Sequence, residues 1–580
     1  MLNKCRDFYR GNKRELERIE EFRQTYTPSK AIQWYTRDSF VYRLVNRAFR
    51  TEDMSLWYLF RFYCIDLSNE LKNLQEQQNI AESFLVYRGQ THLPVNELTK
   101  IRNNIGGLIS TNGFLSTSKL ADVALSFVIG AENTEEFKVV LFEIEVDPFS
   151  RNNCVFADTQ EYSEHGEHEV LFNIGSTFEI INVSIDEKAS LFNDKNPLTR
   201  IRMRTTNKKT NESNKYFDPS KLRNANIEIY FGRLLISLNQ YEKAESYFKM
   251  MLHILPKNHE DIASLYDHLG HLHLQTTNWS EAHNCLNFAQ NIKQKSRPAI
   301  HPVFEITFNG LANYYKAIHN YTKALLYYEK ALKCYGIHEL SVSMTKLNQA
   351  SIQILMKNYD IAFKLCREAF QILIKTQLSP ELEMLQYKGI MGDYHLARRT
   401  YVKAIQYYKE AFDLSEKILL IGDLRRVHSA LALIECYRSQ GNIYDAKLIC
   451  EQQIKIYGTN LTRDYSGIAY FKIKQAELDT GDENKNYLQL QLYEEALNIL
   501  QKNTHLHHEK TAQCLTLIAH CHMKNGSEYE SAVDRLKSAI YIQEKIYPRS
   551  HLLVKNTKKL IDQCNSVIYP IETNNRNLLI

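Results

Sequence analysis

The sequence has no run of about 20 apolar residues, the length that a helix needs to cross a bilayer. Its first residues, Met1–Arg14, are charged throughout and lack the apolar stretch of a secretory signal peptide. The 11 cysteines are odd in number and widely spaced, from Cys5 to Cys564, unlike the framework of a small disulfide-bonded secreted domain. We therefore expect a soluble, cytoplasmic protein with reduced thiols.

The sequence also has no large excess of basic or acidic residues. The 72 lysines and arginines against 67 acidic residues give a net charge of +5 over 580 residues, which is too dilute to attract nucleic acid. Hydrophobic residues make up 44% and charged residues 24%, as in folded globular proteins. At ~100–200 residues per domain, this length predicts two to four domains, or one domain joined to a repeat array.

One element recurs eight times in the C-terminal half: an aromatic or bulky residue, two variable positions and then alanine. Successive alanines lie 38, 42, 38, 42, 42, 50 and 36 residues apart, a mean of about 41 residues that is typical of helical hairpins. The alanines are Ala244, Ala282, Ala324, Ala362, Ala404, Ala446, Ala496 and Ala532.

Each unit has the pattern of two amphipathic helices, since apolar residues recur every three and four positions on both sides of a turn such as His319–Asn320. The small alanine lets the helices touch, and the aromatic residue fills the gap against the next hairpin. These units resemble tetratricopeptide repeats, with the long spacing of the kinesin light chain-like variants. The resemblance implies a solenoid of about eight hairpins over residues 225–565, followed by a tail over 566–580, that binds a peptide or protein partner.

We expect no metal site in this half. Cys514 and Cys521 are not the close pair of a zinc knuckle, and the neighbouring histidines fall on both core and surface faces of a repeat helix. The histidines considered are His271, His273, His505, His507, His508, His520 and His522.

Residues 191–224 are predicted to be a basic linker. Asn, Thr, Ser and two prolines separate its basic residues, which outnumber the acidic ones. The alternative is a contact with an anionic surface or nucleic acid. Its adjacent Tyr216 and Phe217 are not an interleaved stacking series, so we favour a solvated connector, with no specific nucleic-acid partner and no membrane partner.

The first 190 residues have the pattern of an α+β domain. Helical spacing covers residues 37–48, where Asp38 or Ser39 could cap the helix, and residues 54–71. Short runs of β-branched or aromatic residues then predict strands of a largely antiparallel sheet, because no long crossover helices separate the later ones. These runs are 84–89, 113–118, 138–146, 170–174 and 177–183.

Two groups in this domain can bind a phosphorylated sugar. Arg88 and Gly89 lie at the end of a predicted strand, where a guanidinium can grip a phosphate and glycine permits close approach of a ligand. Ser116, Thr117 and Ser118 place three hydroxyls before a predicted helix, where they can bond a sugar. Ser118 could instead cap that helix.

A third group is acidic. Glu167 and Glu169 are two residues apart in front of a predicted strand, so in extended backbone both point to one face. Two carboxylates held together favour a cationic ligand or reacting centre between them. Glu143 and Glu145 have the same spacing but alternate with apolar residues, so we assign them to the polar face of an ordinary strand.

In this order and spacing, Arg88, Ser116-Thr117-Ser118 and Glu167-x-Glu169 resemble the signature of arginine-specific mono-ADP-ribosyltransferases. The resemblance covers roughly residues 30–190. It implies an α+β domain over 1–190, with N-terminal helices and two antiparallel sheets that face an NAD cleft. It also implies NAD or NADP as a co-substrate, with no prosthetic group.

The resemblance assigns the NAD side of the site. Arg88 would bind the phosphates, Gly89 the nicotinamide amide, and Ser116, with Thr117 and Ser118, the nicotinamide-side ribose. Phe127 matches an aromatic residue that stacks on nicotinamide, although it could equally be a core residue of its helix.

On the acceptor side, Glu169 matches the catalytic glutamate and Glu167 the glutamate associated with arginine acceptors. Tyr162 lies where the substrate-recognition loop often has an aromatic residue, whereas His168 departs from the common filler between the glutamates. An ionised Glu169 would stabilise the oxocarbenium-like cation that forms as nicotinamide leaves. Glu167 would orient and partly deprotonate the arginine, whose pKa lies above ~12.

These observations predict an enzyme that transfers ADP-ribose to arginines of proteins selected by the repeat array. An NAD glycohydrolase, in which water replaces arginine, is an alternative in the same cleft. A repeat scaffold with an inactive transferase domain is an alternative of another class.

Overall fold

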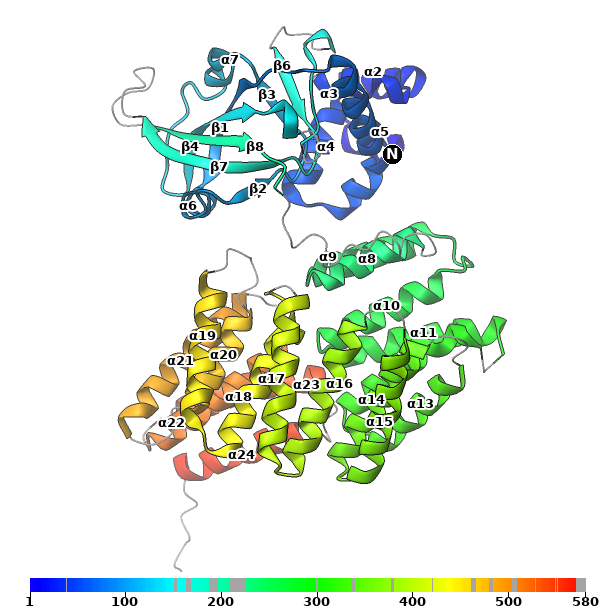
Figure 1. Ribbon diagram of the computed structural model, residues 1–580, viewed down its shortest axis with the longest axis vertical. Coiled ribbons are helices and arrows are strands. Elements are labelled where there is room, and N and C mark those ends of the chain that lie inside the picture. Colours follow the sequence, from blue (N-terminus) through cyan, green and yellow to red (C-terminus); the bar gives the residue numbers. More distant parts are fainter. Residues whose placement is uncertain are drawn as a thin grey trace, which may run out of the picture. The chain divides into compact units, whose positions relative to one another are not determined.

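The computed structural model describes most of the chain, which divides into two compact units, Met1–Asn211 and Glu212–Ile580 (Figure 1). The described residues are 1–37, 39–150, 154–162, 168–186, 197–208, 226–298, 301–334, 339–376, 380–419, 421–459, 466–478, 483–502, 508–526, 528–547, 549 and 551–569. Of the residues named above, Asp38, Glu167, Tyr216, Phe217, His505 and His507 lie outside these ranges, as do positions 191–196 and 209–224 of the predicted linker and 570–580 of the predicted tail.

Five α-helices open the first unit, and they lie together beside the sheet (Figure 1). Two of them fall on the segments of helical spacing predicted at residues 37–48 and 54–71. The Asp53 carboxylate accepts hydrogen bonds from the N–H groups of Ser55 and Leu56 and so caps the longest of them. The helices pack around a buried aromatic cluster that includes Phe22, Trp34 and Tyr63. Their bounds are α1 (Leu2–Phe8), α2 (Lys13–Thr25), α3 (Ala31–Thr36), α4 (Phe40–Thr51) and α5 (Met54–Gln78).

The rest of this unit is a mixed sheet of eight strands in the order β2-β7-β8-β4-β1-β3-β6-β5. Five strands fall on the predicted runs, whereas β2, β5 and β8 were not predicted. The bounds are β1 (Phe84–Pro94), β2 (Leu108–Ser110), β3 (Leu115–Ser118), β4 (Phe137–Val146), β5 (Phe156–Asp158), β6 (Glu169–Phe172), β7 (Thr177–Asp186) and β8 (Leu198–Thr205), with α6 (Val95–Asn103) after β1 and α7 (Ala121–Ser126) after β3.

The expectation of two antiparallel sheets is wrong in two respects. All eight strands belong to one hydrogen-bonded sheet, and β4 and β8 run parallel. Strand β1 pairs with β4 along most of its length but meets β3 at the pair Tyr87 and Ser118. The sheet therefore has two parts, β2-β7-β8-β4-β1 and β3-β6-β5, joined by this narrow contact.

The predicted linker and the domain limit at residue 190 also need correction, because residues 198–205 form the inner strand β8. Ile201 and Met203 are buried on one side of the sheet, while the arginines that alternate with them face the other side. The side chains of Arg200 and Arg202 bind Glu143, and that of Arg204 binds Glu145. This confirms that the two glutamates form the polar face of β4.

The second unit is a helical repeat array, as predicted. Each of the eight repeat alanines is fully buried. In the described part of the unit, helices α8 to α23 form eight hairpins and α24 follows them, so residues 566–568 of the predicted tail are helical. The bounds are α8 (Ile227–Ser237), α9 (Tyr241–Ile254), α10 (Ile262–Gln275), α11 (Trp279–Ser296), α12 (Glu305–Ala317), α13 (Tyr321–Cys334), α14 (Glu339–Leu355), α15 (Tyr359–Lys375), α16 (Glu381–Ala397), α17 (Tyr401–Ile418), α18 (Leu424–Gln440), α19 (Ile443–Thr459), α20 (Ser466–Leu478), α21 (Glu483–Lys502), α22 (His508–Lys524), α23 (Tyr529–Ile546) and α24 (Leu552–Ile568).

The turns inside several hairpins share one backbone conformation. In five hairpins a residue with left-handed backbone lies two positions before the aromatic residue that starts the second helix. A left-handed residue ends an α-helix and lets the chain reverse. These residues are Asn239, Thr277, His319, Lys357 and Arg399.

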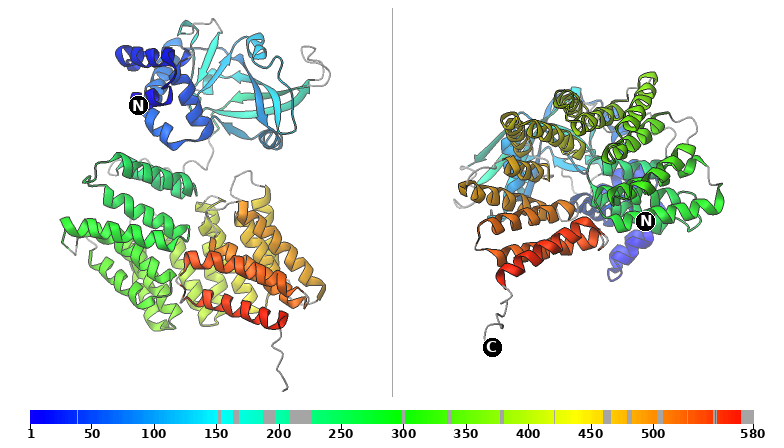
Figure 2. Two further views of the ribbon diagram at one scale, coloured as in Figure 1. Left: turned by 180° about the vertical axis from the view of Figure 1, so that it is seen from behind. Right: turned by 90° about the horizontal axis from the view of Figure 1, so that it is seen from below.

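The array closes on itself (Figure 2). The ring of His551 stacks on Tyr547, with centroids 4.1 Å apart, and on His319, with centroids 5.3 Å apart. Trp279 packs against the cluster that contains Tyr547. We call these four residues the seam, because they join the last hairpin to the second and third.

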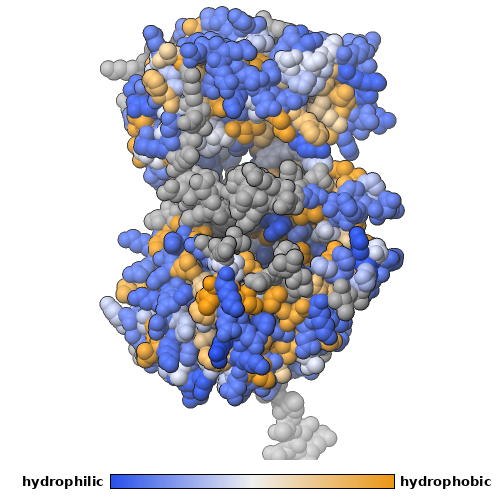
Figure 3. Space-filling model, turned by 45° about the vertical axis from the view of Figure 1, so that its right-hand side comes forward, coloured by the Kyte–Doolittle hydropathy of each residue, from blue (hydrophilic) through white to orange (hydrophobic). Residues whose placement is uncertain are grey.

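Apolar side chains are interspersed with polar ones on the face of the molecule shown in Figure 3. Within the described ranges, no helix combines the length and the apolar character that crossing a lipid bilayer requires. All eleven cysteines are free, and ten of them are buried.

Candidate functional site

A cleft of about 320 Å³ opens in the first unit beside the contact between β1 and β3. It brings together seven of the nine residues predicted for the site: Arg88 and Gly89 from β1, Ser116, Thr117 and Ser118 from β3, Phe127 after α7, and Glu169 from β6. The remaining wall comes from α3, α4 and their connection, together with one more residue of β1 and two of α7. The other lining residues are Tyr35, Thr36, Arg37, Tyr42, Tyr87, Val123 and Ala124.

Glu169 is the first residue of β6, where it pairs with Ser118 of β3. Its side chain is held from both ends. The Ser116 hydroxyl donates a hydrogen bond of 2.6 Å to Oε1, and the Thr159 hydroxyl lies 3.1 Å from Oε2. The residue is 7% exposed, so its carboxylate lines the cleft while remaining largely shielded from water.

Arg88 lies on the opposite strand of the cleft. Its Nη1 donates a hydrogen bond of 2.8 Å to the backbone oxygen of Ser116. This bond spans the gap between β1 and β3 and fixes the guanidinium beside the hydroxyl that binds Glu169. A guanidinium carries five N–H donors, so others can bind an anion in the cleft.

The other two hydroxyls of the predicted group bond within the protein. Thr117 is buried, and its hydroxyl donates to the backbone oxygen of Val170 at 2.8 Å. The Ser118 hydroxyl accepts a hydrogen bond of 3.0 Å from the N–H of Leu120, just before α7. The N-cap of α7 is Leu120 and has no side-chain cap, so the alternative that Ser118 caps this helix is wrong.

Gly89 has a packing role that the sequence did not indicate. A side chain at this position would bring its Cβ within 2.2 Å of the backbone oxygen of Ala124 and 2.8 Å of Val128. Glycine therefore lets α7 lie against β1. This contact places Phe127, which is 61% exposed, at the edge of the cleft. The alternative that Phe127 is a core residue is wrong.

The residues predicted to contact the acceptor arginine are Tyr162 and Glu167. Tyr162 is not among the lining residues: it packs against the helical core, and its backbone oxygen accepts a hydrogen bond of 2.9 Å from Thr36. Glu167 lies outside the described residues. The sequence argument assumed extended backbone from Glu167 to Glu169, but His168 has a φ of 47°, which is left-handed. The alternation rule for strands therefore does not apply across His168.

Sequence reasoning missed the contribution of the N-terminal helices to the cleft. Tyr35 is buried at its wall and donates a hydrogen bond of 3.0 Å to Asn46. Burial, together with the neighbouring Tyr42, raises the pKa of Tyr35, so its hydroxyl stays protonated. Arg37 binds Glu21 at 3.2 Å and lies over the Trp34 ring. The helical spacing of this segment carries no signal of these roles.

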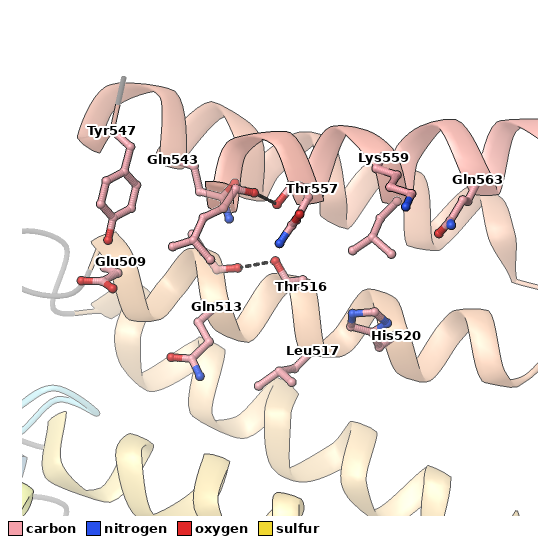
Figure 4. A pocket seen from close by; sticks show the side chains of 14 residues that line it. Glu509, Gln513, Thr516, Leu517, His520, Gln543, Tyr547, Thr557, Lys559 and Gln563 are labelled. Carbon is pink, nitrogen blue, oxygen red and sulfur yellow. Dashed lines mark hydrogen bonds between the residues drawn. The ribbon is translucent and has the colours of Figure 1, made fainter. Parts of the chain in front are cut away.

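The repeat array has cavities of its own. One of them, of about 620 Å³, lies between α22, α23 and α24 (Figure 4). Apolar side chains such as Leu517 and Leu560 line it together with amides and the charged Glu509 and Lys559. A smaller one, of about 230 Å³, is lined from α12, α14 and α16 by residues that include Asn309 and Asn348.

Among the residues that the structure describes, no three His, Cys, Asp or Glu side chains are grouped so that they could hold a metal ion. Several histidines of the array are instead packed against other rings. Burial lowers the pKa of His268, which stacks on Phe248, to about 3.

No protein-family model matches the chain, and neither does any curated protein sequence. Three solved structures show partial similarity. A Rap protein complexed with competence and sporulation factor is 11% identical, with 59% of this chain and 98% of that chain covered and a TM-score of 0.38. A putative kinesin light chain from Podospora anserina is 18% identical (36% of this chain and 98% of that chain covered, TM-score 0.28), and a chain of the complex between exoenzyme S from Pseudomonas aeruginosa and human 14-3-3 protein beta is 16% identical (38% of this chain and 96% of that chain covered, TM-score 0.24). With these TM-scores, the likenesses carry no weight for function.

Proposed function

We propose that the first unit transfers ADP-ribose from NAD to arginine side chains. The observation that carries this proposal is the hydrogen bond between Ser116 and Glu169 in a cleft that Arg88 also lines. A shielded carboxylate, oriented by a hydroxyl and placed near a guanidinium, suits a substrate with a diphosphate and a bond that breaks to leave a cation.

In the proposed reaction, the bond between the ribose and the nicotinamide nitrogen breaks, and its electron pair leaves with nicotinamide. The positive charge that develops on the ribose is stabilised by Glu169, because an ionised carboxylate interacts with this cation more strongly than with ground-state NAD. Arg88 would hold the phosphates, and the exposed ring of Phe127 would stack on nicotinamide. A nitrogen of the acceptor guanidinium then bonds to the ribose carbon and releases a proton.

By its resemblance to the family signature, Glu167 would orient the acceptor arginine and take up part of that proton. The repeat array would select the target protein, and its cavities between neighbouring helices are candidate surfaces for a peptide or protein partner.

An NAD glycohydrolase is the second candidate. The position of Tyr162 favours it, because this residue packs on the helical core and does not line the cleft. In this case water attacks the ribose in place of arginine.

The test is incubation of the purified full chain with NAD labelled in its adenylate and with agmatine, a simple guanidine. We expect labelled agmatine and free nicotinamide from the wild type, and neither from Glu169→Gln. Transfer that persists in Glu169→Gln would remove this residue from its role. No NAD turnover by the wild type would favour the inactive scaffold.

The variant Glu167→Ala separates the two enzymatic candidates. We expect it to lose transfer to agmatine while it still releases nicotinamide. Equal loss of both activities would contradict the acceptor role of Glu167.

A further inference from the structure

Thr159 contacts Glu169 from the side opposite Ser116. Its hydroxyl lies 3.1 Å from Oε2 of Glu169 and 3.3 Å from the backbone oxygen of the same residue. A threonine hydroxyl has a single proton, and both of these neighbours are acceptors. Thr159 therefore acts as a donor to Glu169, and the shorter contact is the one to the carboxylate.

The position of Thr159 is set by its neighbours on three elements. Its backbone N–H donates to the backbone oxygen of Glu169 at 2.8 Å, directly after the pairing of β5 with β6. The preceding Asp158 exchanges two hydrogen bonds with Gln78 of α5 and forms an ion pair with Lys119, which follows β3. Thr159 itself is fully buried. Its hydroxyl thus has little freedom to turn away from Glu169.

The hydroxyls of Ser116 and Thr159 contact different oxygens of the Glu169 carboxylate, Oε1 and Oε2 respectively. Burial disfavours the charged form of a carboxyl group, whereas hydrogen bonds donated to that form favour it. Two donors also fix the plane of the carboxylate, because each oxygen has its own partner. Thr159 does not line the cleft, so it can support Glu169 without touching a substrate.

We infer that Thr159 is a positioning residue that keeps the Glu169 carboxylate ionised and fixed in the cleft, and this inference rests on the function proposed above. Its role differs from that of Ser116, which lines the cleft and can contact the substrate as well as Glu169.

Two variants test the hydroxyl. Thr159→Val has nearly the same shape but cannot donate, whereas Thr159→Ser keeps the donor and loses a methyl group. In NAD cleavage by the full chain, we expect Thr159→Val to lower kcat about tenfold and to move the acid limb of the pH profile upward by about one pH unit. The KM for NAD should stay within a factor of about two, since binding groups are unchanged. Thr159→Ser should restore both the rate and the acid limb.

A second measurement does not depend on catalysis. The infrared difference between wild type and Glu169→Gln, recorded against pH, gives the titration of the Glu169 carboxyl group. The same difference in the Thr159→Val background should have a midpoint about one pH unit higher. If Thr159→Val does not fold, Thr159→Ala serves as the variant without a donor.

An unchanged midpoint in a folded variant without the donor would overturn the inference, as would an unchanged acid limb in an active one. A wild type that does not cleave NAD would instead defeat the proposed function, and the infrared titration would still decide the role of Thr159.

Discussion

Tyr87 and Ser118 are the residues through which β1 and β3 meet, and the candidate site opens beside them. Away from this pair, β1 continues along β4 while β3 continues along β6. The two strands that carry Arg88 and Ser116 thus diverge, and the space between them is the cleft. The site thus lies where β1 and β3 are paired through a single pair of residues.

Loss of the Ser116 hydroxyl should slow NAD cleavage. In Ser116→Ala, Oε1 of Glu169 loses a donor at 2.6 Å, so the carboxylate is less well oriented. We expect kcat to fall by roughly 10- to 100-fold, measured as nicotinamide release at saturating NAD. The matched control is Ser126→Ala on α7, because Ser126 does not line the cleft and its hydroxyl donates to the backbone oxygen of Val123. Equal rates in the two variants would contradict this role.

Gly89→Ala should destabilise the first unit. Its new methyl group would lie 2.2 Å from the backbone oxygen of Ala124, so α7 must move away from β1. We expect a loss of about 1–3 kcal/mol in the free energy of unfolding, measured by chemical denaturation. Gly11→Ala is the control, because no atom lies within 4 Å of a methyl group added there. A Gly89→Ala protein as stable as Gly11→Ala would show that α7 does not need this close approach.

The repeat alanines should resist enlargement. Ala404 is fully buried in α17, where the helices of its hairpin meet. We expect Ala404→Leu to cost about 1–3 kcal/mol through overpacking. In the same helix, Val402 is 76% exposed, so Val402→Ala should change stability by less than about 0.5 kcal/mol. Thermal unfolding of both variants measures this difference in stability. Equal stability of the two variants would show that the site of Ala404 can hold a larger side chain.

The array should lose stability in mild acid. The pKa of His268 in the folded protein is about 3, below its ordinary 6.5, so the unfolded chain takes up a proton first as the pH falls. The free energy of unfolding therefore decreases as the pH falls below 6.5, by roughly 1–2 kcal/mol at pH 5 from this residue.

Denaturation of the full chain at pH 7.5 and pH 5 measures this loss. His268→Gln cannot take up the proton, so its stability should differ less between the two pH values. The exposed His253 offers the control His253→Gln, which should behave as the wild type does. The same pH dependence in all three proteins would exclude His268 as the source.

Much of the architecture follows from local sequence. The repeat alanines recur with a nearly constant period because each hairpin has the same need for a small residue where its helices touch, and all eight are buried. The helices α4 and α5 and five of the strands also follow from local patterning. Strand β8 escaped prediction because its arginines suggest a linker, although they alternate with buried apolar residues and neutralise Glu143 and Glu145.

By itself, the sequence determined the periodic array and the order of Arg88, Ser116 and Glu169 along the chain, because spacing and residue type are local properties. Only the tertiary structure decided that Thr159 contacts Glu169 and that Tyr35 forms part of the cleft wall. It also decided that His551 stacks on His319. Such contacts join segments far apart in the chain. They depend on how strands pair and helices pack, which no single segment specifies.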